Sequence, residues 1–335
     1  VYERGTTAAI LGLAYWASGN VEAAHRSFSE GLGVFQMLGG VQITVNATFI
    51  LANMMMAQGL LRTAAKTCEQ ALHLATQQPG PMRQGKAELH LALSEIRYEQ
   101  GDLAAANQLL QKGEALREQM SISGAAYLWW LVKAQLTAAQ GDLDAALEQL
   151  DEAARLYKRS PVPNVRPIEA LKVRWWLQQG RLAEALGWMR ECGLSLADQP
   201  DYLREYEHLT VVRVAIAQYR RDRTDEMPQI VGLLTRLLTA AEEQDRMGSI
   251  IKILAILALA NEAQGELAAA TAYLERALTL ADPEGYVRIF AECGPPMARL
   301  LREAITRGII PTYTTQLLPA LDTWGQPPPP STPLR

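Results

Sequence analysis

The chain has 335 residues, a formal net charge of −4 and hydrophobic side chains at 49% of its positions. This mildly acidic balance gives no electrostatic basis for direct contact with nucleic acid. The longest apolar run, from Ile250 to Ala260, is interrupted by Lys252 and is too short to cross a bilayer, so no membrane contact is expected. The three cysteines lack CxxC spacing, which is typical of a reducing compartment, and we expect a cytoplasmic protein.

One short phrase recurs along the chain at a nearly constant interval. A clear copy is Gln140-Gly141-Asp142-Leu143-Asp144-Ala145-Ala146, and its glycine returns about every 40 residues. The recurring glycines are Gly19, Gly59, Gly101, Gly141, Gly180 and Gly265. The last interval is about twice the others and predicts a degraded copy near residue 222, in the polar stretch from Tyr219 to Glu226. Such a period indicates a solenoid of stacked units and not a globular enzyme with one central core.

The phrase predicts a turn between two helices. Glycine ends a helix readily because it adopts the left-handed conformation after the C-cap, and the Asp, Asn or Glu that often follows favours the start of the next helix. An alanine lies five residues after each glycine, at Ala24, Ala64, Ala106, Ala146, Ala185 and Ala270. A small residue at one fixed phase lets two helices approach closely. The expected fold is therefore all-α, a right-handed superhelical solenoid of about seven to eight helical hairpins.

The predicted elements follow in chain order. The first repeat pairs helices at about residues 3–17 and 21–38. The repeats expected in the solenoid, which spans residues 1–322, are 3–38, 42–77, 82–119, 122–158, 167–192, 201–244, 247–281 and 285–322. The sixth repeat lacks the turn glycine, and Pro228 is expected to begin its second helix. In the last unit, helices at about 295–307 and 312–322 precede a proline-rich linker or tail at 323–335.

Two stretches carry a family likeness. The pattern that resembles the tetratricopeptide repeat (TPR) is Leu11-Gly12-x-x-Tyr15-x-x-x-Gly19-x-x-x-x-Ala24-x-x-x-Phe28. The longer period is similar to that of the sensor domain of MalT-type regulators, which are large ATP-binding transcriptional activators of the LuxR class in bacteria. The most specific part of this likeness is Gly285-Tyr286-Val287-Arg288-Ile289-Phe290, followed by Gly294-Pro295-Pro296. The likeness covers essentially residues 1–322.

The resemblance implies a set of modules and partners. In that family an NTPase module precedes the repeats and a helix-turn-helix module follows them. The repeats are taken to bind an inducer, or a regulatory protein, and to control ATP-dependent self-association. The chain does not begin with Met and starts inside a predicted helix, so we expect a segment of a larger protein. No cofactor is expected in this segment, because ATP would bind in the upstream module.

Motifs for catalysis and metal binding are weak. The stretch from Gly80 to Ala87 approaches a phosphate-binding loop, but Ala87 stands where Ser or Thr would hold magnesium, so an inter-repeat turn is favoured. The four histidines lack paired metal-ligand spacing. No Gly-x-Ser-x-Gly elbow occurs, and no cysteine has a local catalytic signature. The sequence therefore predicts neither an enzyme nor a metal site.

Two adjacent tryptophan pairs raise a choice between packing and ligand stacking. Because the side chains of consecutive residues on a helix point about 100° apart, the two members of each pair lie on different faces of their helix. Trp130 and Trp176 match the core phase of the repeat, so Trp129 and Trp175 are expected to face a neighbouring helix or solvent. Core packing is favoured for all four over stacking on a sugar or nucleobase.

The repeat phase predicts which residues face the groove. The first helices of stacked hairpins line the concave wall of such a superhelix. The expected ligand-binding residues are Trp16, Asn53, Met56, Glu95, Tyr98, Gln135, Arg174 and Glu262. This mixture of amides, charges and aromatic rings suits a polar ligand or a peptide, although the same residues could solvate an empty groove.

Two functions from different classes remain. The first is a ligand-sensing and protein-interaction domain of a multidomain transcriptional activator. The alternative is a generic TPR scaffold that binds a peptide or helix of a partner protein. A hydrolase is disfavoured because the sequence has no nucleophile–base motif.

Overall fold

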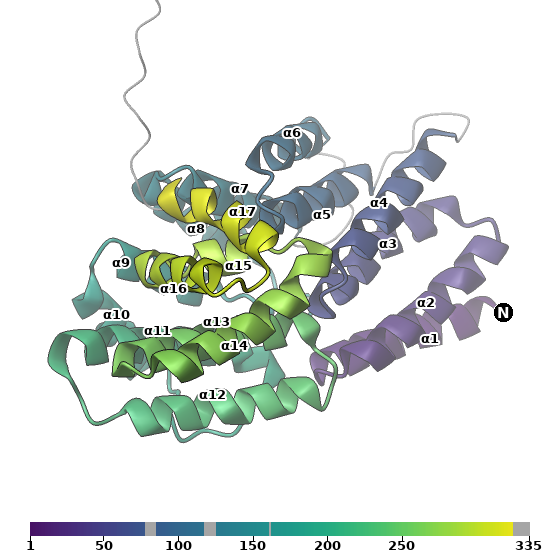
Figure 1. Ribbon diagram of the computed structural model, residues 1–335. Helices are drawn as coiled ribbons and strands as arrows, with labels where there is room; N and C mark the ends of the chain where they lie inside the picture. The colour runs from purple at the N-terminus through teal and green to yellow at the C-terminus, as the bar shows by residue number, and fades with distance from the viewer. Residues whose placement is uncertain (78–84, 117–124, 161, 324–335) are drawn as a thin grey trace, which may run out of the picture.

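The structure is a computed structural model that describes residues 1–77, 85–116, 125–160 and 162–323. Every regular element in these ranges is helical (Figure 1). The helices are α1 Tyr2–Ala17, α2 Val21–Met37, α3 Val41–Ala57, α4 Leu61–Thr76, α5 Lys86–Glu99, α6 Leu103–Glu114, α7 Ala125–Ala139, α8 Leu143–Leu156, α9 Ile168–Gln178, α10 Leu182–Glu191, α11 Glu205–Asp222, α12 Met227–Glu242, α13 Met247–Gln264, α14 Leu267–Ala281, α15 Arg288–Ala291, α16 Pro295–Thr306 and α17 Pro311–Thr323. Short 3₁₀ segments, η2 Tyr202–Arg204 and η3 Asp282–Glu284, precede α11 and follow α14.

Some predicted features fall outside the described residues. They are the expected starts of the third and fourth repeats at 82 and 122, the end of the third repeat at 119, most of the stretch from Gly80 to Ala87, and the proline-rich tail beyond Thr323.

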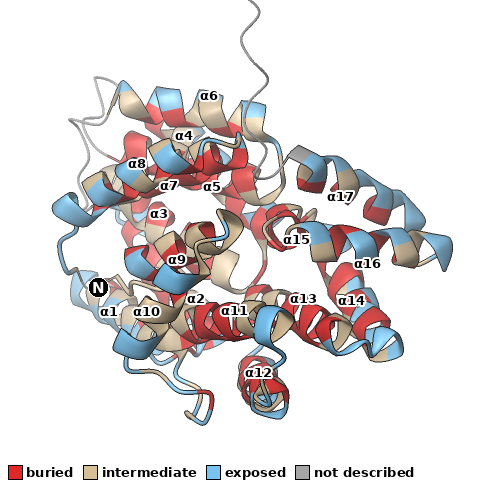
Figure 2. Ribbon diagram, turned by 90° about the vertical axis from the view of Figure 1, so that its left-hand side faces the viewer, coloured by how far each residue is buried: buried red, intermediate tan, exposed pale blue. Residues whose placement is uncertain are grey.

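The helices pack as successive hairpins. Within each hairpin α1 contacts α2, α3 contacts α4, and the pattern continues to α13 and α14. Between hairpins the second helix of one unit contacts the first helix of the next, as α2 does with α3 and α4 with α5. The second helices α6, α12 and α14 lie towards the outside of the assembly, and the buried faces point inward (Figure 2). This arrangement confirms the predicted all-α solenoid of paired helices.

The turns have the geometry that their sequence predicts. All six recurring glycines have positive φ, from +74° at Gly180 to +96° at Gly141. At the first turn the Gly19 amide donates to the Trp16 carbonyl and the Asn20 amide donates to the Tyr15 carbonyl, each at 3.0 Å. Paired bonds of this kind satisfy the last carbonyls of a helix. The side chains of Asn20, Asp102 and Asp142 then cap the following helices, each accepting from an amide at 3.0 Å.

The degraded copy near residue 222 ends its helix without glycine. Arg223 occupies the C-cap of α11 with φ of +54°, a conformation that costs a residue with a Cβ about 1–2 kcal/mol. Its guanidinium lies 5.4 Å from the centroid of the Tyr219 ring and donates to the Ala263 carbonyl at 3.1 Å. These contacts offset the backbone strain. The next helix, α12, starts at Met227 with Pro228 in its first turn.

All four tryptophans pack against the core as predicted, but the more buried member of each pair is not the one assigned to the core phase. Trp129 and Trp175 are buried, with 5% and 2% of their surfaces exposed, whereas Trp130 and Trp176 are half-buried. The residues five positions before each turn glycine explain the reversal. They are buried in every repeat that has the glycine except the first, at Met54, Ile96, Leu136, Trp175 and Ala260. Trp175 belongs to this buried phase, and Trp129 lies seven residues before Leu136 on the same face of its helix.

The first repeat differs from this pattern. Leu11 and Tyr15, which the TPR-like pattern places on a packed face, are exposed, and Ala14 is exposed as well. In the described residues α1 packs mainly against α2, so its other side lacks a neighbouring hairpin. Gly12 alone of this pattern in α1 is fully enclosed, because its Cα lies close against α2 near Phe28.

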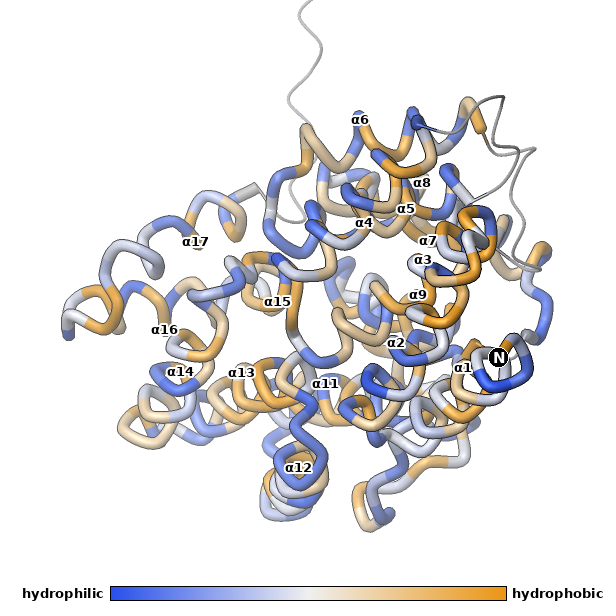
Figure 3. The backbone as a smooth tube through the Cα atoms, turned by 90° about the vertical axis from the view of Figure 1, so that its right-hand side faces the viewer, coloured by the Kyte–Doolittle hydropathy of each residue, from blue (hydrophilic) through white to orange (hydrophobic). Residues whose placement is uncertain are grey.

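Helix α13 is a largely buried helix of the core. Its 18 residues are apolar enough by length and composition to cross a membrane, with a hydropathy of 1.3 over the window. However, 61% of that window is buried inside the structure, where α13 contacts α3, α11, α12 and α14. In Figure 3 the backbone of α13 carries much of the orange of hydrophobic residues and lies between α11 and α14. Burial in the core therefore explains its composition.

The superhelix brings the turns of the early repeats against the C-terminal segment. The Val287 amide donates to the Glu99 carbonyl at 2.8 Å, and Glu284 accepts from the Arg62 amide at 2.8 Å. Farther along, the Tyr98 hydroxyl donates to Glu292 at 2.8 Å. Repeats two and three are thus bonded directly to residues that follow the seventh hairpin. The repeat pattern did not predict this closure.

Replacing two turn glycines by alanine should separate the cost of the turn from the cost of closure. Both Gly101 (φ +79°) and Gly265 (φ +89°) are left-handed, so each alanine variant should lose about 1–2 kcal/mol of unfolding free energy. Only at Gly101 would the new Cβ lie 2.9 Å from the Val287 Cβ, whereas nothing lies within 4 Å at Gly265. We expect Gly101→Ala to cost about 1–3 kcal/mol more in urea unfolding, because overpacking adds to the strain. Equal losses in the two variants would contradict the contact with Val287.

Candidate functional site

A cavity of about 110 Å³ lies inside the superhelix. One wall comes from the first helices of the first three repeats. Trp16 of α1, Asn53 and Met56 of α3, and Glu95 and Glu99 of α5 line it. These helices present their concave sides to it because the turn glycines set them at a constant spacing.

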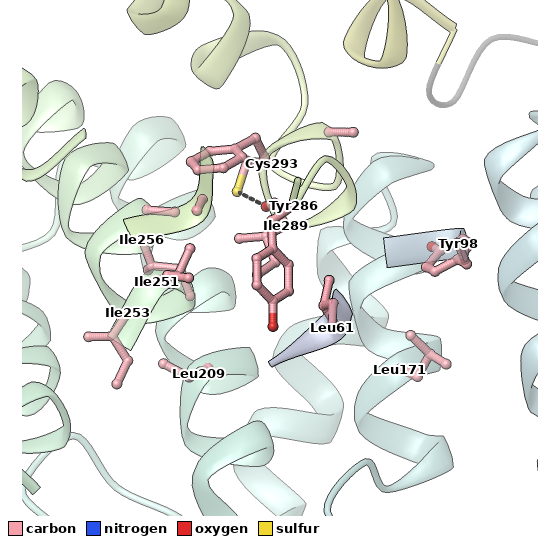
Figure 4. Close-up of a cluster of buried hydrophobic side chains, with 14 of the residues drawn as sticks. Leu61, Tyr98, Leu171, Leu209, Ile251, Ile253, Ile256, Tyr286, Ile289 and Cys293 are labelled. Carbon is pink, nitrogen blue, oxygen red and sulfur yellow. Dashed lines mark hydrogen bonds between the residues drawn. The ribbon is translucent and has the colours of Figure 1, made fainter. Parts of the chain in front are cut away.

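The opposite wall comes from the sixth and seventh repeats and the C-terminal segment. Tyr206 of α11 and Ser249 and Lys252 of α13 line it, together with Tyr202 of η2 and Tyr286. The Tyr286 ring reaches from the C-terminal segment past Leu61, with its hydroxyl at the tip (Figure 4). Burial raises the pKa of Tyr286 well above its ordinary value, so the phenol is neutral. The cavity therefore depends on segments that are distant in sequence.

A hydrogen-bonded network ties the first repeat to the sixth and seventh. The Trp16 indole donates to the Tyr202 hydroxyl at 3.0 Å. Arg246 lies 5.0 Å from the centroid of the Tyr202 ring and pairs with Glu205 at 3.0 Å. Glu205 also accepts from the Ser249 hydroxyl. Glu205 and Arg246 are both buried, so this ion pair fixes the rim of the cavity with its charges already matched.

The connection between α8 and α9 enters the interior. Its three prolines, Pro161, Pro163 and Pro167, interrupt the repeat register, and Pro161 lies outside the described residues. Arg166 forms an ion pair with Glu95 of α5, and the side chains of both are largely shielded from solvent. Burial opposes the charge of Arg166, but Glu95 and Glu99 outweigh it and raise the pKa of Arg166. A second cavity, of about 40 Å³, lies between this connection, Trp16 and Asn53.

Two charges on the cavity wall are not committed to an ion pair. Burial raises the pKa of the Glu99 carboxyl above its ordinary value of 4.5, although Lys252 opposes this shift. The Glu99 Oε2 atom is buried and accepts no hydrogen bond from the described residues. Within the same residues no carboxylate lies within ion-pair distance of Lys252. The cavity thus offers a buried acceptor and a cation that a polar ligand could use.

A third cavity, of about 30 Å³, continues from the first and shares Glu99, Arg166 and Lys252 with it. Gln135 of α7 and Arg174 of α9 line it. The Arg174 guanidinium lies 3.6 Å from the centroid of the Tyr206 ring and donates to the Thr210 hydroxyl at 3.0 Å. Burial lowers the pKa of Arg174, which reports a cation that its surroundings do not fully neutralise.

The structure places the eight predicted site residues in three groups. Trp16, Asn53, Met56 and Glu95 meet around the first cavity. Gln135 and Arg174 line the adjoining one. Tyr98 lines none of the cavities described here, because it is buried under the C-terminal segment and bonded to Glu292. Glu262 lies farther along α13, where it pairs with Arg220 and Arg299.

Sequence reasoning missed the residues that come from outside the first five repeats. Arg166, Tyr202 and Lys252 all line the first cavity. The prolines around Arg166 marked a break in register, but a break does not reveal that the chain turns inward. Glu99 had a weaker signal, since it lies beside the predicted Tyr98 and shares the end of a first helix.

The described ranges contain no group of three or more His, Cys, Asp or Glu side chains that could hold a metal ion. The three cysteines, Cys68, Cys192 and Cys293, are free thiols. Burial raises the pKa of the Cys68 thiol to about 12, so that thiol is an inert packing group at neutral pH.

Paired helices, left-handed turns and an enclosed polar interior define a helical repeat protein of the tetratricopeptide class. Proteins of this class are typically non-catalytic scaffolds. The chain belongs to the family described as the MalT-like TPR region, which residues 1–307 match. No curated protein matches the chain at a significant level.

The Glu99 carboxyl predicts a pH dependence of stability. Its pKa in the folded chain lies above the ordinary value of 4.5, so the folded state holds the proton more tightly than the unfolded state between these two values. Stability should fall as pH rises through this window and stay lower above it. Glu99→Gln should remove this loss and be at least as stable as the parent at neutral pH. Urea unfolding from about pH 4 to about pH 8 measures the difference.

A matched control for that series is Glu275→Gln, which changes an exposed carboxylate on the outer helix α14. Its stability profile should run parallel to that of the parent chain. If Glu99→Gln also runs parallel to the parent, burial does not control the Glu99 carboxyl.

Proposed function

We propose that this chain is the ligand-sensing and protein-interaction domain of a multidomain, ATP-dependent transcriptional activator in bacteria. A small polar inducer binds in the interior cavity and thereby controls self-association of the full-length protein. The observation that carries the proposal is the interior site itself, with the uncommitted charges of Glu99 and Lys252 held by helices from distant repeats. Membership of the MalT-like TPR family supports the same assignment.

The shape of the interior favours a small molecule over an extended peptide. The connection that carries Arg166 and the side chain of Tyr286 occupy the concave space that a peptide would need. The first cavity, at about 110 Å³, is also smaller than the roughly 300 Å³ at the low end of sites for drug-sized ligands. A larger inducer would therefore displace this connection as it binds. The binding of a partner's peptide remains the alternative function.

The position of the cavity supports a sensing mechanism. Its walls belong to repeats at both ends of the superhelix, and direct bonds such as Trp16 to Tyr202 hold these ends together. A ligand that contacts both walls binds the closed and open superhelices with different affinities, so it shifts the balance between them. The repeats carry this change to the NTPase module expected upstream, which is where ATP binds. The domain itself performs no catalysis and contacts neither nucleic acid nor membrane in the cytoplasm.

Substitution of Asn53 should identify the binding site. Asn53 lines the first cavity, and its amide nitrogen donates to the Phe49 carbonyl at 2.8 Å. Asn107 on the outer helix α6 makes the equivalent bond to Leu103 at 3.0 Å and provides a matched control. Calorimetry of the chain against a panel of polar metabolites should yield a ligand. Asn53→Ala should weaken its binding about tenfold through loss of one polar contact, and Asn107→Ala should leave it unchanged.

Two outcomes would overturn the proposal. Equal binding by both variants would place the ligand outside the cavity. If no metabolite in the panel binds and a partner protein binds tightly, the peptide-binding scaffold would be favoured instead.

A further inference from the structure

A larger cavity, of about 270 Å³, lies beyond the interior site. It is bounded by α9, α11, α13 and the turn that begins α16. It meets the small 30 Å³ cavity at Arg174, Arg213 and Glu292, which line both. The ligand-binding residues predicted from the sequence include Arg174 but not Arg213 or Arg220, which also line this larger cavity.

The cavity has more positive than negative side chains. Three arginines line it, namely Arg174, Arg213 and Arg220, against one carboxylate, Glu292. Arg220 pairs with Glu262 and so has its charge matched. Glu292 accepts from the buried Tyr98 hydroxyl and keeps its negative charge. Arg174 and Arg213 together exceed that single charge and leave the cavity net positive.

Arg174 and Arg213 lack carboxylate partners. Among the described residues neither forms an ion pair within 4.0 Å. Arg213 makes only long contacts, to the Glu292 carbonyl at 3.4 Å and to the Cys293 sulfur at 3.5 Å. Its Nε atom is buried and has no hydrogen-bond partner. Arg174 donates to the Thr210 hydroxyl at 3.0 Å and to the Tyr206 carbonyl at 3.3 Å, which are both neutral acceptors. Buried guanidinium groups usually have an anion beside them, so two guanidinium groups without an ion-pair partner beside one cavity indicate a place for an anion.

Apart from Gln178, the rest of the wall is mainly apolar. Leu177, Ile216, Ala217 and Leu259 contribute from the three helices, and Pro295 and Pro296 contribute from the start of α16. Neither proline has an amide hydrogen, so neither can donate a backbone hydrogen bond to a ligand. A ligand that satisfies both parts of the cavity has an anionic head and a hydrophobic body.

We propose that this cavity is a second binding site, which takes an organic anion with a compact phosphate or carboxylate group on an apolar body. The anion lies between Arg174 and Arg213, where the two guanidinium forks donate to its oxygens. The body packs on Ala217 and on the two prolines. Those prolines are the first residues of α16, and α16 contacts α17. Binding at this site therefore affects the packing of both C-terminal helices.

Calorimetry with phenyl phosphate tests this proposal on the whole chain at constant ionic strength. Benzoate replaces phosphate by carboxylate, inorganic phosphate removes the ring, and benzyl alcohol removes the charge. We expect saturable binding of phenyl phosphate or benzoate that is at least tenfold tighter than that of inorganic phosphate or benzyl alcohol. A preference for phenyl phosphate or for benzoate assigns the head group, and either preference supports the site.

Three variants locate the binding. Arg213→Met removes an unmatched cation while keeping a side chain of similar length, and should weaken binding at least tenfold. Ala217→Phe fills the cavity and leaves all three arginines in place, so it should also weaken binding. If Arg213→Met does not fold, the affinity of Ala217→Phe for the ligand tests the site. Arg276→Met is the charge-matched control, since Arg276 is half-exposed on α14 and pairs with Glu242 outside the cavity.

The proposal is overturned if no ligand binds at millimolar concentration, if benzyl alcohol binds as tightly as the anions, or if both cavity variants bind like the parent chain. Asn53→Ala distinguishes this site from the inducer site, because it should leave phenyl phosphate binding intact. Loss of binding in Asn53→Ala alone would place the anion in the first cavity and refute the second site.

Discussion

The left-handed turn that joins each pair of helices is the constraint on which the remaining structure depends. Positive φ at glycines such as Gly101 and Gly141 ends one helix, and the capping aspartate that follows starts the next. The alanine five residues later is fully buried in all six copies, which lets the paired helices pack closely. Hairpins built in this way stack on their neighbours to form a superhelix. Where the glycine is missing, Arg223 maintains the geometry through contacts with Tyr219 and Ala263.

Local chemistry made this part of the fold predictable from the sequence. Turn, cap and small-residue positions are each determined by neighbours within about one helical turn, so one chain displays them directly. Which residues of each helix are most deeply buried was harder to predict from the sequence. Trp175 and Trp176 both belong to an amphipathic pattern, but only the packing of one repeat on the next decides which is covered. A repeat motif describes contacts within a hairpin better than contacts between hairpins, and the exposed Tyr15 of the first repeat shows the same limit.

The candidate site also combines residues that the repeat pattern predicts with residues that it does not. Phase relative to the turn glycine located Asn53 and Glu95, because both face the concave side of regular first helices. The same phase placed Tyr98 in the groove, where the C-terminal segment in fact covers it and Glu292 accepts its hydroxyl. Arg166 and Tyr202 lie in irregular segments that carry no periodic signal. Their positions result from closure of the superhelix, which is a long-range property that no local pattern encodes.

The polar interior has a physical consequence for how this domain responds to ligands. Buried ion pairs such as Glu95 with Arg166 add little net stability, since apolar residues of similar volume would often do as well. They do make closure conditional, because separating the partners leaves each charge in a poorly solvated place. In the function proposed here, a polar ligand beside Glu99 and Lys252 would exchange contacts with buried groups that already interact with one another. The free energy of such an exchange is small for each group but acts on segments from both ends of the chain. Closure of the superhelix can therefore respond to occupancy without any large change within a single hairpin.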